Sequence, residues 1–372
     1  MKQTIIIAAI SSRAYVESAF AAGFDVIAID AFADVDTQAK CKQLFQVEVQ
    51  NGQFDAQQLI TTLNEIDLSN CLGLCFGAGF EAQPDLLARI SERIPLLGNT
   101  TQTVAACKNP QLLVEFCANN HIAMPVIQFT RPINTSGWLQ KYIGGSGGAH
   151  IKAVLPLDKS ALSLETLNNQ VVYYQKVQAG IAYSCLFLTH QKNSQVIGFN
   201  EQWCMPSSIP DSVKPYRFGG AVSNAELNEQ VKKSISECVA KATVFFGLNG
   251  MNSCDFLVHN DSIYLLEINP RLSATMGLYT CKKGNLLAAH VQACEGNLQL
   301  WPVVEKQAHA MQIVYANNLA YVPVDMDWPD WVCDIPQPNS QISAGAPICT
   351  VVADAHTAKL AKQKVLQRAA SL

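Results

Sequence analysis

The sequence has few charges and no long apolar run, and these two features argue against several classes of protein. Charged residues make up 15% of the chain, with 30 acids against 26 lysines and arginines and no block of like charge. This balance argues against nucleic acid or an anionic membrane surface as a partner. No apolar stretch reaches the roughly 20 residues that span a bilayer, and no signal-peptide pattern follows Met1. We therefore expect a cytoplasmic protein.

The cysteines lack the pattern of a disulfide framework or a zinc site. There are 13, an odd number spread from Cys41 to Cys349, and no two form a C-x-x-C pair. Cys71 and Cys75 flank Leu-Gly-Leu in a predicted strand, but no His or Cys stands near them in the sequence to complete a metal site. We expect most of these cysteines to be small buried apolar side chains in a reducing compartment.

The first turn of the chain lacks the glycines of a dinucleotide-binding motif. Residues 1–98 alternate strand and helix, which predicts a parallel sheet flanked by helices. The turn after the first strand reads A-A-I-S-S-R, so NAD or FAD is not expected there. Ser12 and Arg13 begin the following helix, where free N–H groups favour an anion. They could bind a substrate carboxylate, or they could form a serine N-cap beside a solvated arginine.

A glycine-rich segment in the middle of the chain is not a Walker loop, because its lysine precedes the glycines and a strand is expected to follow. Lys141 ends a predicted strand, and the loop after it contains Gly144, Gly145, Ser146, Gly147 and Gly148. Consecutive N–H groups in such a loop can bind a phosphate, although a glycine-rich hairpin by itself is often a flexible turn. His150 is a candidate general base or a structural histidine at a strand end.

The strongest signal is the late apolar strand Ile263–Arg271, which reads I-Y-L-L-E-I-N-P-R. Strand alternation places Glu267, Asn269 and Arg271 on one face. An earlier predicted strand carries Asp255, and a turn at residues 259–262 would set Asp255 beside Glu267 in a hairpin. Two carboxylates and an amide oxygen suit a hard divalent cation that is also bound by phosphates. The sequence therefore predicts magnesium with a nucleoside triphosphate.

Two further segments carry candidate ligand contacts. A strand edge at a crossover between lobes could offer backbone hydrogen bonds to a nucleobase, and this segment contains Gln175, Lys176, Val177 and Gln178. The loop K-P-Y-R-F-G-G contains Lys214 and Arg217 and is either a substrate contact or a surface turn.

Together, the lysine before the glycine-rich hairpin, the hinge strand and the late D…E-I-N-P-R module resemble the ATP-grasp superfamily. The opening S-S-R-A-Y-V-E-S-A-F resembles a branch related to biotin carboxylase, associated with one-carbon carrier coenzymes of the methanopterin and methylofuran types, and more distantly tyramine–glutamate ligase. The resemblance implies an α/β fold with an N-terminal parallel α/β domain at residues 1–98. An ATP-grasp domain would follow at 99–300, with a small β-rich lid at about 125–178 and a larger ATP-binding lobe, then a C-terminal subdomain at 301–372.

The resemblance also implies roles for individual residues. ATP would be bound by Lys108, Lys141, the loop of residues 144–148 and, at adenine, residues 175–178. Magnesium, with manganese as a possible substitute, would be bound by Asp255, Glu267 and Asn269. Catalytic roles would fall to Arg271, Lys141 and Arg217, and substrate binding to Ser12, Arg13, Lys214 and Arg217. The hinge departs from the family pattern, because Gln175 stands where glutamate is common and Ile181 and Ala182 replace an acid.

The implied reaction joins a carboxylate to an amine through an acyl phosphate and releases ADP. The expected partners are ATP and small carboxylate and amine substrates, with an amino acid such as glutamate as one of them, and the expected setting is coenzyme biosynthesis. A homodimer is a possible assembly. A carboxylase that makes carboxyphosphate from bicarbonate would use the same phosphate-binding residues, and a nucleotide-binding protein without turnover is a third alternative.

Overall fold

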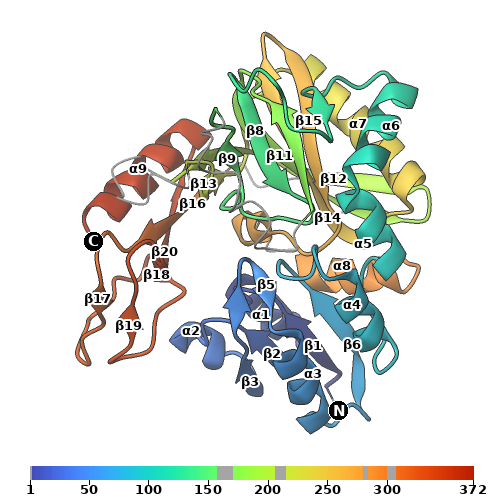
Figure 1. Ribbon diagram of the computed structural model, residues 1–372. Helices are drawn as coiled ribbons and strands as arrows, with labels where there is room; N and C mark the ends of the chain where they lie inside the picture. Colours follow the sequence, from blue (N-terminus) through green and yellow to red (C-terminus); the bar gives the residue numbers. More distant parts are fainter. Residues whose placement is uncertain (1, 157–170, 206–214, 280–283, 300–306) are drawn as a thin grey trace.

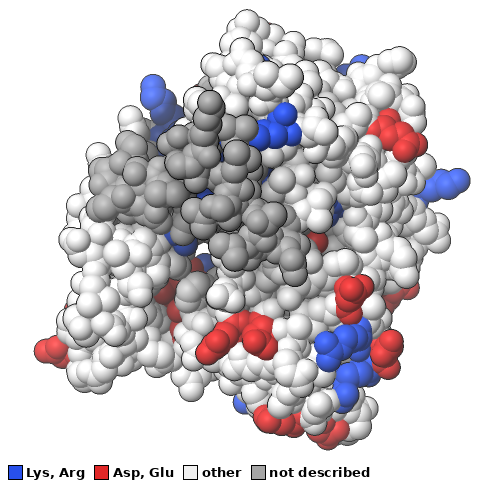
Figure 2. Space-filling model, viewed as in Figure 1, with Lys and Arg blue, Asp and Glu red and all other residues white. Residues whose placement is uncertain are grey.

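The computed structural model describes residues 2–156, 171–205, 215–279, 284–299 and 307–372. Lys214, an expected substrate contact, lies outside these ranges. Figure 1 shows the N-terminal domain in blue at the bottom, a large lobe above it, and the C-terminal strands and helix at the left. Among the described helices, none combines the length and the apolarity needed to cross a membrane. Acidic and basic side chains on the face in Figure 2 lie in small separate groups.

The parallel sheet predicted for the N-terminal domain is present, and it has four strands in the order β3-β2-β1-β6. Its strands are β1 (Thr4–Ala8), β2 (Asp25–Asp30), β3 (Gln43–Gln46) and β6 (Cys71–Phe76). Its helices are α1 (Arg13–Ala21), α2 (Val35–Gln38), α3 (Ala56–Glu65) and α4 (Pro84–Ser91), with a hairpin of β4 (Val49–Gln50) and β5 (Gln53–Phe54). Every residue of β1 is buried, as expected for a parallel strand that is covered on both faces.

Alternate residues of β1 belong to two different cores. Ile5 and Ile7 pack in one cluster with Val16 of α1, whereas Ile6 packs in the other with Leu59 of α3. The first cluster also includes residues of the large lobe, from β11 (Ile181–His190) and from α8 (Leu286–Cys294). The N-terminal domain and the large lobe therefore share a continuous apolar core, and this core sets the position of one against the other.

The large lobe is built on an antiparallel sheet of eight strands in the order β15-β14-β11-β12-β13-β16-β20-β18. The first five in sequence are β11 (Ile181–His190), β12 (Asn193–Cys204), β13 (Phe218–Val222), β14 (Gly250–His259) and β15 (Ser262–Asn269). The others are β16 (Ala308–Tyr315), β18 (Val332–Cys333) and β20 (Pro347–Ala355). β16, β18 and β20 lie within the expected C-terminal subdomain of residues 301–372, and they belong to the same sheet as the strands before residue 301. The domain bounds stay a prediction.

Helices cover this sheet. Clustered on one face are residues of α5 (Thr101–Lys108), α6 (Pro110–Asn120) and α7 (Glu229–Phe246). The terminal helix α9 (Ala358–Ala370) packs on β16 and β20. A short 3₁₀ turn, η1 (Ala274–Leu278), follows β15, and β17 (Ala320–Tyr321) pairs with β19 (Gln341–Ile342) at the lower left of Figure 1. The described cysteines are all free.

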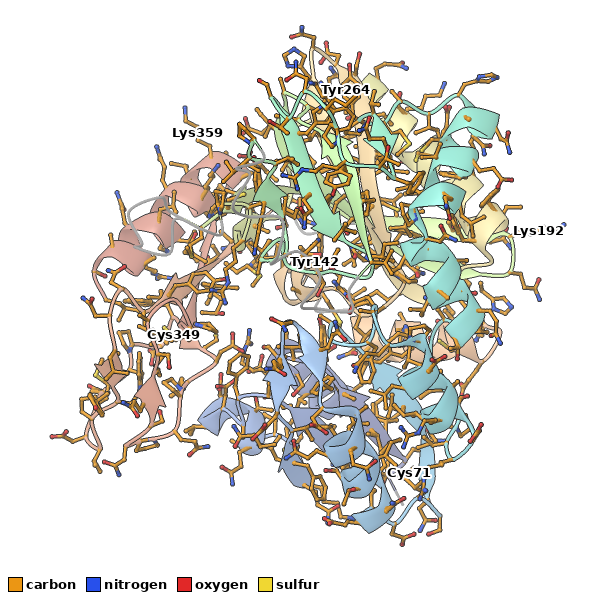
Figure 3. The ribbon with its side chains drawn as sticks, in the orientation of Figure 1. Cys71, Tyr142, Lys192, Tyr264, Cys349 and Lys359 are labelled. Carbon is orange, nitrogen blue, oxygen red and sulfur yellow. The ribbon has the colours of Figure 1, made fainter. Side chains whose placement is uncertain are left out.

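A separate four-stranded antiparallel sheet lies within the predicted lid. It consists of β7 (Ile127–Gln128), β8 (Trp138–Tyr142), β9 (Lys152–Ala153) and β10 (Val172–Lys176), in the order β7-β10-β8-β9. We expected a strand over residues 150–155, and only its middle is extended and paired, as β9. Tyr142 ends β8 and lies near the centre of Figure 3, above the N-terminal domain.

Candidate active site

The predicted hairpin of two acids is confirmed. β14 and β15 pair with Asp255 opposite Glu267, and Asn269 follows two residues later on the same face. The Asn269 side-chain amide donates to Asp255 Oδ2 at 2.9 Å. Because the strands are adjacent and joined by a turn at Asn260 and Asp261, both in the left-handed region, the local sequence suffices to bring the three side chains together.

A lysine from a distant helix reaches this cluster. Lys108 is the last residue of α5, and its Nζ donates to Asn269 Oδ1 at 2.7 Å and lies 3.5 Å from Glu267 Oε2. The helix stops there because the next residue, Asn109, is extended and caps α6 instead. The end of α5 therefore delivers a buried ammonium to the acid pair.

The acid pair is electrostatically asymmetric. Burial and the neighbouring Glu267 raise the pKa of Asp255 to about 7. Burial also acts to raise the pKa of Glu267, but the ammonium groups of Lys108 and Lys141 outweigh it and hold the pKa of Glu267 well below its ordinary value. Glu267 is therefore ionised at neutral pH, whereas Asp255 holds its proton to a much higher pH than an ordinary aspartic acid. A divalent cation between them would remove this repulsion.

The donor set fits a hard cation better than zinc. Within the described ranges, no group of three or more His, Cys, Asp or Glu residues could hold a metal ion. Asp255, Glu267 and Asn269 offer oxygen atoms only, which is the donor type that magnesium prefers when phosphate oxygens and water complete its shell. The residues thus fit magnesium with a nucleotide, while manganese as a substitute stays a prediction.

A second lysine approaches from the lid. Lys141 on β8 and Gln175 on β10 lie on neighbouring strands, and Lys141 Nζ donates to Gln175 Oε1 at 3.1 Å. Burial lowers the pKa of Lys141, although Glu267 and Asp255 act against this shift. The Nε2 group of Gln175 is buried without a hydrogen-bond partner among the described residues. Lys108 therefore contacts Glu267 from α5, while the charge of Lys141 acts on Glu267 from the lid.

The side chains of the other predicted hinge residues, 176–178, do not contact the acid pair. Lys176 Nζ donates to the Ser136 carbonyl at 3.0 Å, and Gln178 Nε2 donates to the Ala179 carbonyl at 3.1 Å. The Val177 side chain is 48% exposed. Adenine contacts by residues 175–178 stay a prediction.

The glycine loop sits between the N-terminal domain and the segment that follows residue 215. A Cβ on Gly144 would lie 2.5 Å from the Ala82 Cα, and one on Gly148 would lie 1.8 Å from the Tyr216 carbonyl oxygen. Both glycines have a φ of +74°, and the Gly147 carbonyl accepts from Phe218 N–H at 3.0 Å. These positions require glycine for space as well as for conformation. The phosphate-binding role of residues 144–148 stays a prediction.

His150 is a poor general base in this position. Its ring packs against Gly145, and its Nδ1 is buried without a hydrogen-bond partner in the described part of the chain. Burial is the main reason that its pKa is lowered to about 4. An imidazole with such a pKa is neutral at physiological pH and has little affinity for a proton.

Glu81 was missed by the sequence analysis. It follows β6 in the N-terminal domain, and its Oε1 accepts from Arg271 Nε at 2.8 Å. The two residues are 190 positions apart, so no spacing rule could pair them. One feature of the sequence could have identified Glu81: it is a lone acid in a glycine-containing loop after a buried parallel strand. Ligand sites often occur at the carboxyl ends of such strands.

The expected substrate residues contact other groups. Ser12 donates to Asp30 Oδ2 through its backbone N–H at 2.7 Å and its hydroxyl at 2.6 Å. Arg13 forms ion pairs with Asp334 and Glu17 at 2.9 and 2.7 Å. The Arg217 guanidinium lies 4.3 Å from the Tyr315 ring centre and donates to the Gly345 carbonyl. Substrate binding by these residues stays a prediction.

Comparison with known proteins agrees with this geometry. The ATP-grasp domain family matches residues 107–275, a range that includes Lys108, Lys141, the glycine loop and the acid pair. An uncharacterized protein of Methanocaldococcus jannaschii is 22% identical over 366 residues, covering 94% of this chain and 87% of that protein. Tyramine–L-glutamate ligase of the same organism is 41% identical over 64 residues, covering 17% of this chain and 20% of the ligase.

Solved structures share the whole fold at low sequence identity. The L-amino acid ligase of Bacillus licheniformis aligns with a TM-score of 0.68 and 14% identity over 99% of this chain and 97% of that one. The biotin carboxylase domain of Hydrogenobacter thermophilus 2-oxoglutarate carboxylase, a dimer in complex with MgADP, ADP and bicarbonate, aligns with a TM-score of 0.72 and 10% identity over 99% and 90%. Residues 107–275 therefore match the ATP-grasp domain family, and the chain shares its fold with an L-amino acid ligase and a biotin carboxylase domain.

Proposed function

We propose that the protein is an ATP-dependent carboxylate–amine ligase that forms an amide through an acyl phosphate. One substrate would be an amino acid, with glutamate as the first candidate, and the product would serve coenzyme biosynthesis. The observation that carries the proposal is the acid pair of Asp255 and Glu267, which Lys108 contacts from α5 and whose Glu267 feels the charge of the buried Lys141 in the lid. Support for an amino-acid substrate comes from the matches to an L-amino acid ligase and to tyramine–L-glutamate ligase.

The balance of charges suits transfer of a phosphoryl group. A triphosphate brings several negative charges, and two buried lysines are available to offset them: Lys108, which contacts Glu267, and Lys141 in the lid. Magnesium, held by Asp255, Glu267 and Asn269, would neutralise further charge on the phosphates. Electrostatic positioning of this kind carries most of the catalysis of phosphoryl transfer.

The reaction would proceed in two steps. A carboxylate oxygen of the first substrate bonds to the γ-phosphorus while the bond to the β,γ-bridging oxygen breaks, and ADP is released. The amine nitrogen of the second substrate then bonds to the acyl carbon, inorganic phosphate departs, and the amine loses one proton. During the first step Lys108, Lys141 and Arg271 would stabilise charge on the transferred group.

An ADP-release assay tests the proposal. Purified protein, ATP and magnesium are incubated with single amino acids, with small amines and with pairs of the two. We expect turnover that needs one amino acid and one amine and that yields equal amounts of ADP, phosphate and amide. Release of ADP that no combination stimulates would contradict the proposal.

A matched pair of variants tests the site. Glu267→Gln keeps the shape of the side chain but removes its charge, and we expect turnover to fall about 100-fold or more. Glu201→Gln removes a carboxylate on β12, two strands from β14, that pairs with Lys362 of α9 at 2.7 Å, and it serves as the control. If Glu267→Gln kept turnover within twofold of the control, the assignment of Glu267 to the metal would be wrong.

A carboxylase is the second candidate, because the related biotin carboxylase domain was solved with bicarbonate. Such an enzyme would phosphorylate bicarbonate with the same lysines and acids. In the ADP-release assay, stimulation by bicarbonate in the absence of any amine would favour this function over the ligase.

A further inference from the structure

The guanidinium group of Arg271 is held from the N-terminal domain. Its Nε donates to Glu81 Oε1 at 2.8 Å, and its Nη1 donates to the Leu272 carbonyl at 3.0 Å. The Arg271 side chain is 12% exposed and that of Glu81 is 3% exposed. Within the described part of the chain, the third nitrogen, Nη2, makes no hydrogen bond. Two bonds therefore fix the plane of the guanidinium and leave one amino group for an anion.

Glu81 is itself a fixed carboxylate. Its Oε2 accepts from the backbone N–H groups of Gly79 and Phe80 at 2.8 and 3.2 Å. Burial alone would raise the pKa of Glu81, but Arg271 and Lys108 outweigh it and lower this pKa below the ordinary value. The side chain is therefore an ionised acceptor at neutral pH, and both of its oxygens are engaged.

The N-terminal domain also holds the backbone beside Arg271. Leu272 N–H donates to the Phe76 carbonyl at 3.1 Å, and the Tyr15 hydroxyl donates to the Leu272 carbonyl at 3.3 Å. The segment that contains Glu81 also contacts the lid, because Gly144 of the glycine loop packs against Ala82 and the Glu81 carbonyl. Glu81 thus lies where the N-terminal domain, the glycine loop and the end of β15 meet.

We propose that Glu81 is a positioning residue for Arg271, orienting its free amino group toward the γ-phosphoryl group of bound nucleotide. The inference rests on the proposed function, because it needs a triphosphate beside the acid pair. An arginine without such a partner samples many rotamers, and ordering it on binding costs free energy. The ion pair with Glu81 reduces this cost, because it restricts the rotamers of Arg271 through contacts within the protein alone.

If the ion pair of Glu81 and Arg271 served stability alone, its loss would have a different effect on nucleotide binding. Buried ion pairs contribute little to stability on balance, but breaking one by removing a single partner is destabilising. If Glu81 only joined the two domains, its loss would weaken every ligand equally or lower stability alone. A positioning role instead concerns the γ-phosphate, so its loss should discriminate between a diphosphate and a triphosphate.

Calorimetric titration of two probes separates these roles. The probes are MgADP and the magnesium complex of the non-hydrolysable β,γ-imido analogue of ATP, and the proteins are the wild type, Glu81→Gln, Glu81→Asp and the control Glu201→Gln. For Glu81→Gln we expect the Kd for MgADP to stay within about twofold and the Kd for the analogue to rise about tenfold, the usual worth of one charged hydrogen bond. Glu81→Asp keeps the charge and should show a smaller rise, and the control should change neither Kd.

The possible outcomes distinguish failure of the positioning role of Glu81 from failure of the proposed function. If Glu81→Gln left both Kd values unchanged or raised them by equal factors, Glu81 would not position Arg271, while the proposed function would stand. If the wild type bound neither probe, the proposed function would fail and the inference with it. Should Glu81→Gln not fold, Glu81→Asp decides, because an unchanged ratio of its two Kd values would overturn the inference.

Discussion

Replacing Asp255 with asparagine should stabilise the protein without ligand at high pH. The Asp255 carboxyl is buried beside Glu267, and both effects raise its pKa from 3.8 to about 7. An acid with a raised pKa in the folded state holds its proton more tightly there than in the unfolded chain. Its contribution to stability is therefore lost as pH rises from about 4 to about 7, and the loss persists above pH 7.

The size of the effect follows from the shift. A rise from 3.8 to about 7 corresponds to about 4 kcal/mol at 1.36 kcal/mol for each pKa unit. The Glu267 side chain is 29% exposed, so water screens the repulsion, and we expect about half of that value. The amide introduced by Asp255→Asn could still accept from Asn269 and donate to Glu267. It would lose the long contact of 3.4 Å that Gln202 Nε2 makes with Asp255 Oδ1, so the substitution removes the charge at the cost of one weak hydrogen bond.

Urea unfolding followed by circular dichroism measures this difference. With EDTA present, the free energy of unfolding of Asp255→Asn minus that of the wild type should increase by about 2 kcal/mol between pH 4.5 and pH 8. Asp85→Asn, at the exposed first turn of α4, is the control. Excess MgADP should reverse the order, because ligand at 100 times its Kd stabilises the wild type by about 2.7 kcal/mol and should bind the variant poorly.

One result would refute the argument. If the difference between Asp255→Asn and the wild type did not change with pH, or shrank as pH rose, the two carboxyls would not repel each other in the folded protein. The acid pair would then be no reason to expect a divalent cation at this position.

Three other substitutions test the surroundings of the acid pair. Gly148→Ala should force the glycine loop away from Tyr216, since its Cβ would lie 1.8 Å from that carbonyl oxygen, and thermal unfolding should show a smaller stabilisation by MgADP. Gln175→Glu should partly neutralise Lys141 and weaken MgADP binding severalfold in calorimetry, and tighter binding would contradict this. His150→Gln should leave the shape of the pH–rate profile unchanged between pH 6 and 9, because the His150 pKa lies near 4.

The local sequence was sufficient to predict those features that depend on residues close together in the chain. The pairing of Asp255 with Glu267 needed only two strands and a turn, and the alternation of strand and helix in residues 1–98 needed only hydrophobic periodicity. The helix α7 was not predicted, although Asn228 caps it and its buried residues repeat at helical spacing from Val231 to Phe246. That signal was present in the sequence and was overlooked.

Contacts between distant segments could not be predicted in the same way. Glu81 meets Arg271 only because β6 and the end of β15 converge at one edge of the N-terminal domain. Likewise, the ion pair of Arg13 with Asp334 of the C-terminal region, at 2.9 Å, was not predicted. Pairing of charges across 190 or more positions depends on packing that no spacing rule contains.

Because the eight-stranded sheet includes strands from both sides of residue 301, a fragment that ends near this residue would lack part of the sheet. β16 pairs with β13 from Gly220 to Val222, so a fragment that ended before β16 would leave the N–H and C=O groups of β13 open along a new edge. Trp203 and Val222, which pack in the cluster beneath α9, would also be uncovered. A fragment of this kind combines an unpaired strand with an apolar surface, and this combination favours self-association over folding of an independent nucleotide-binding unit.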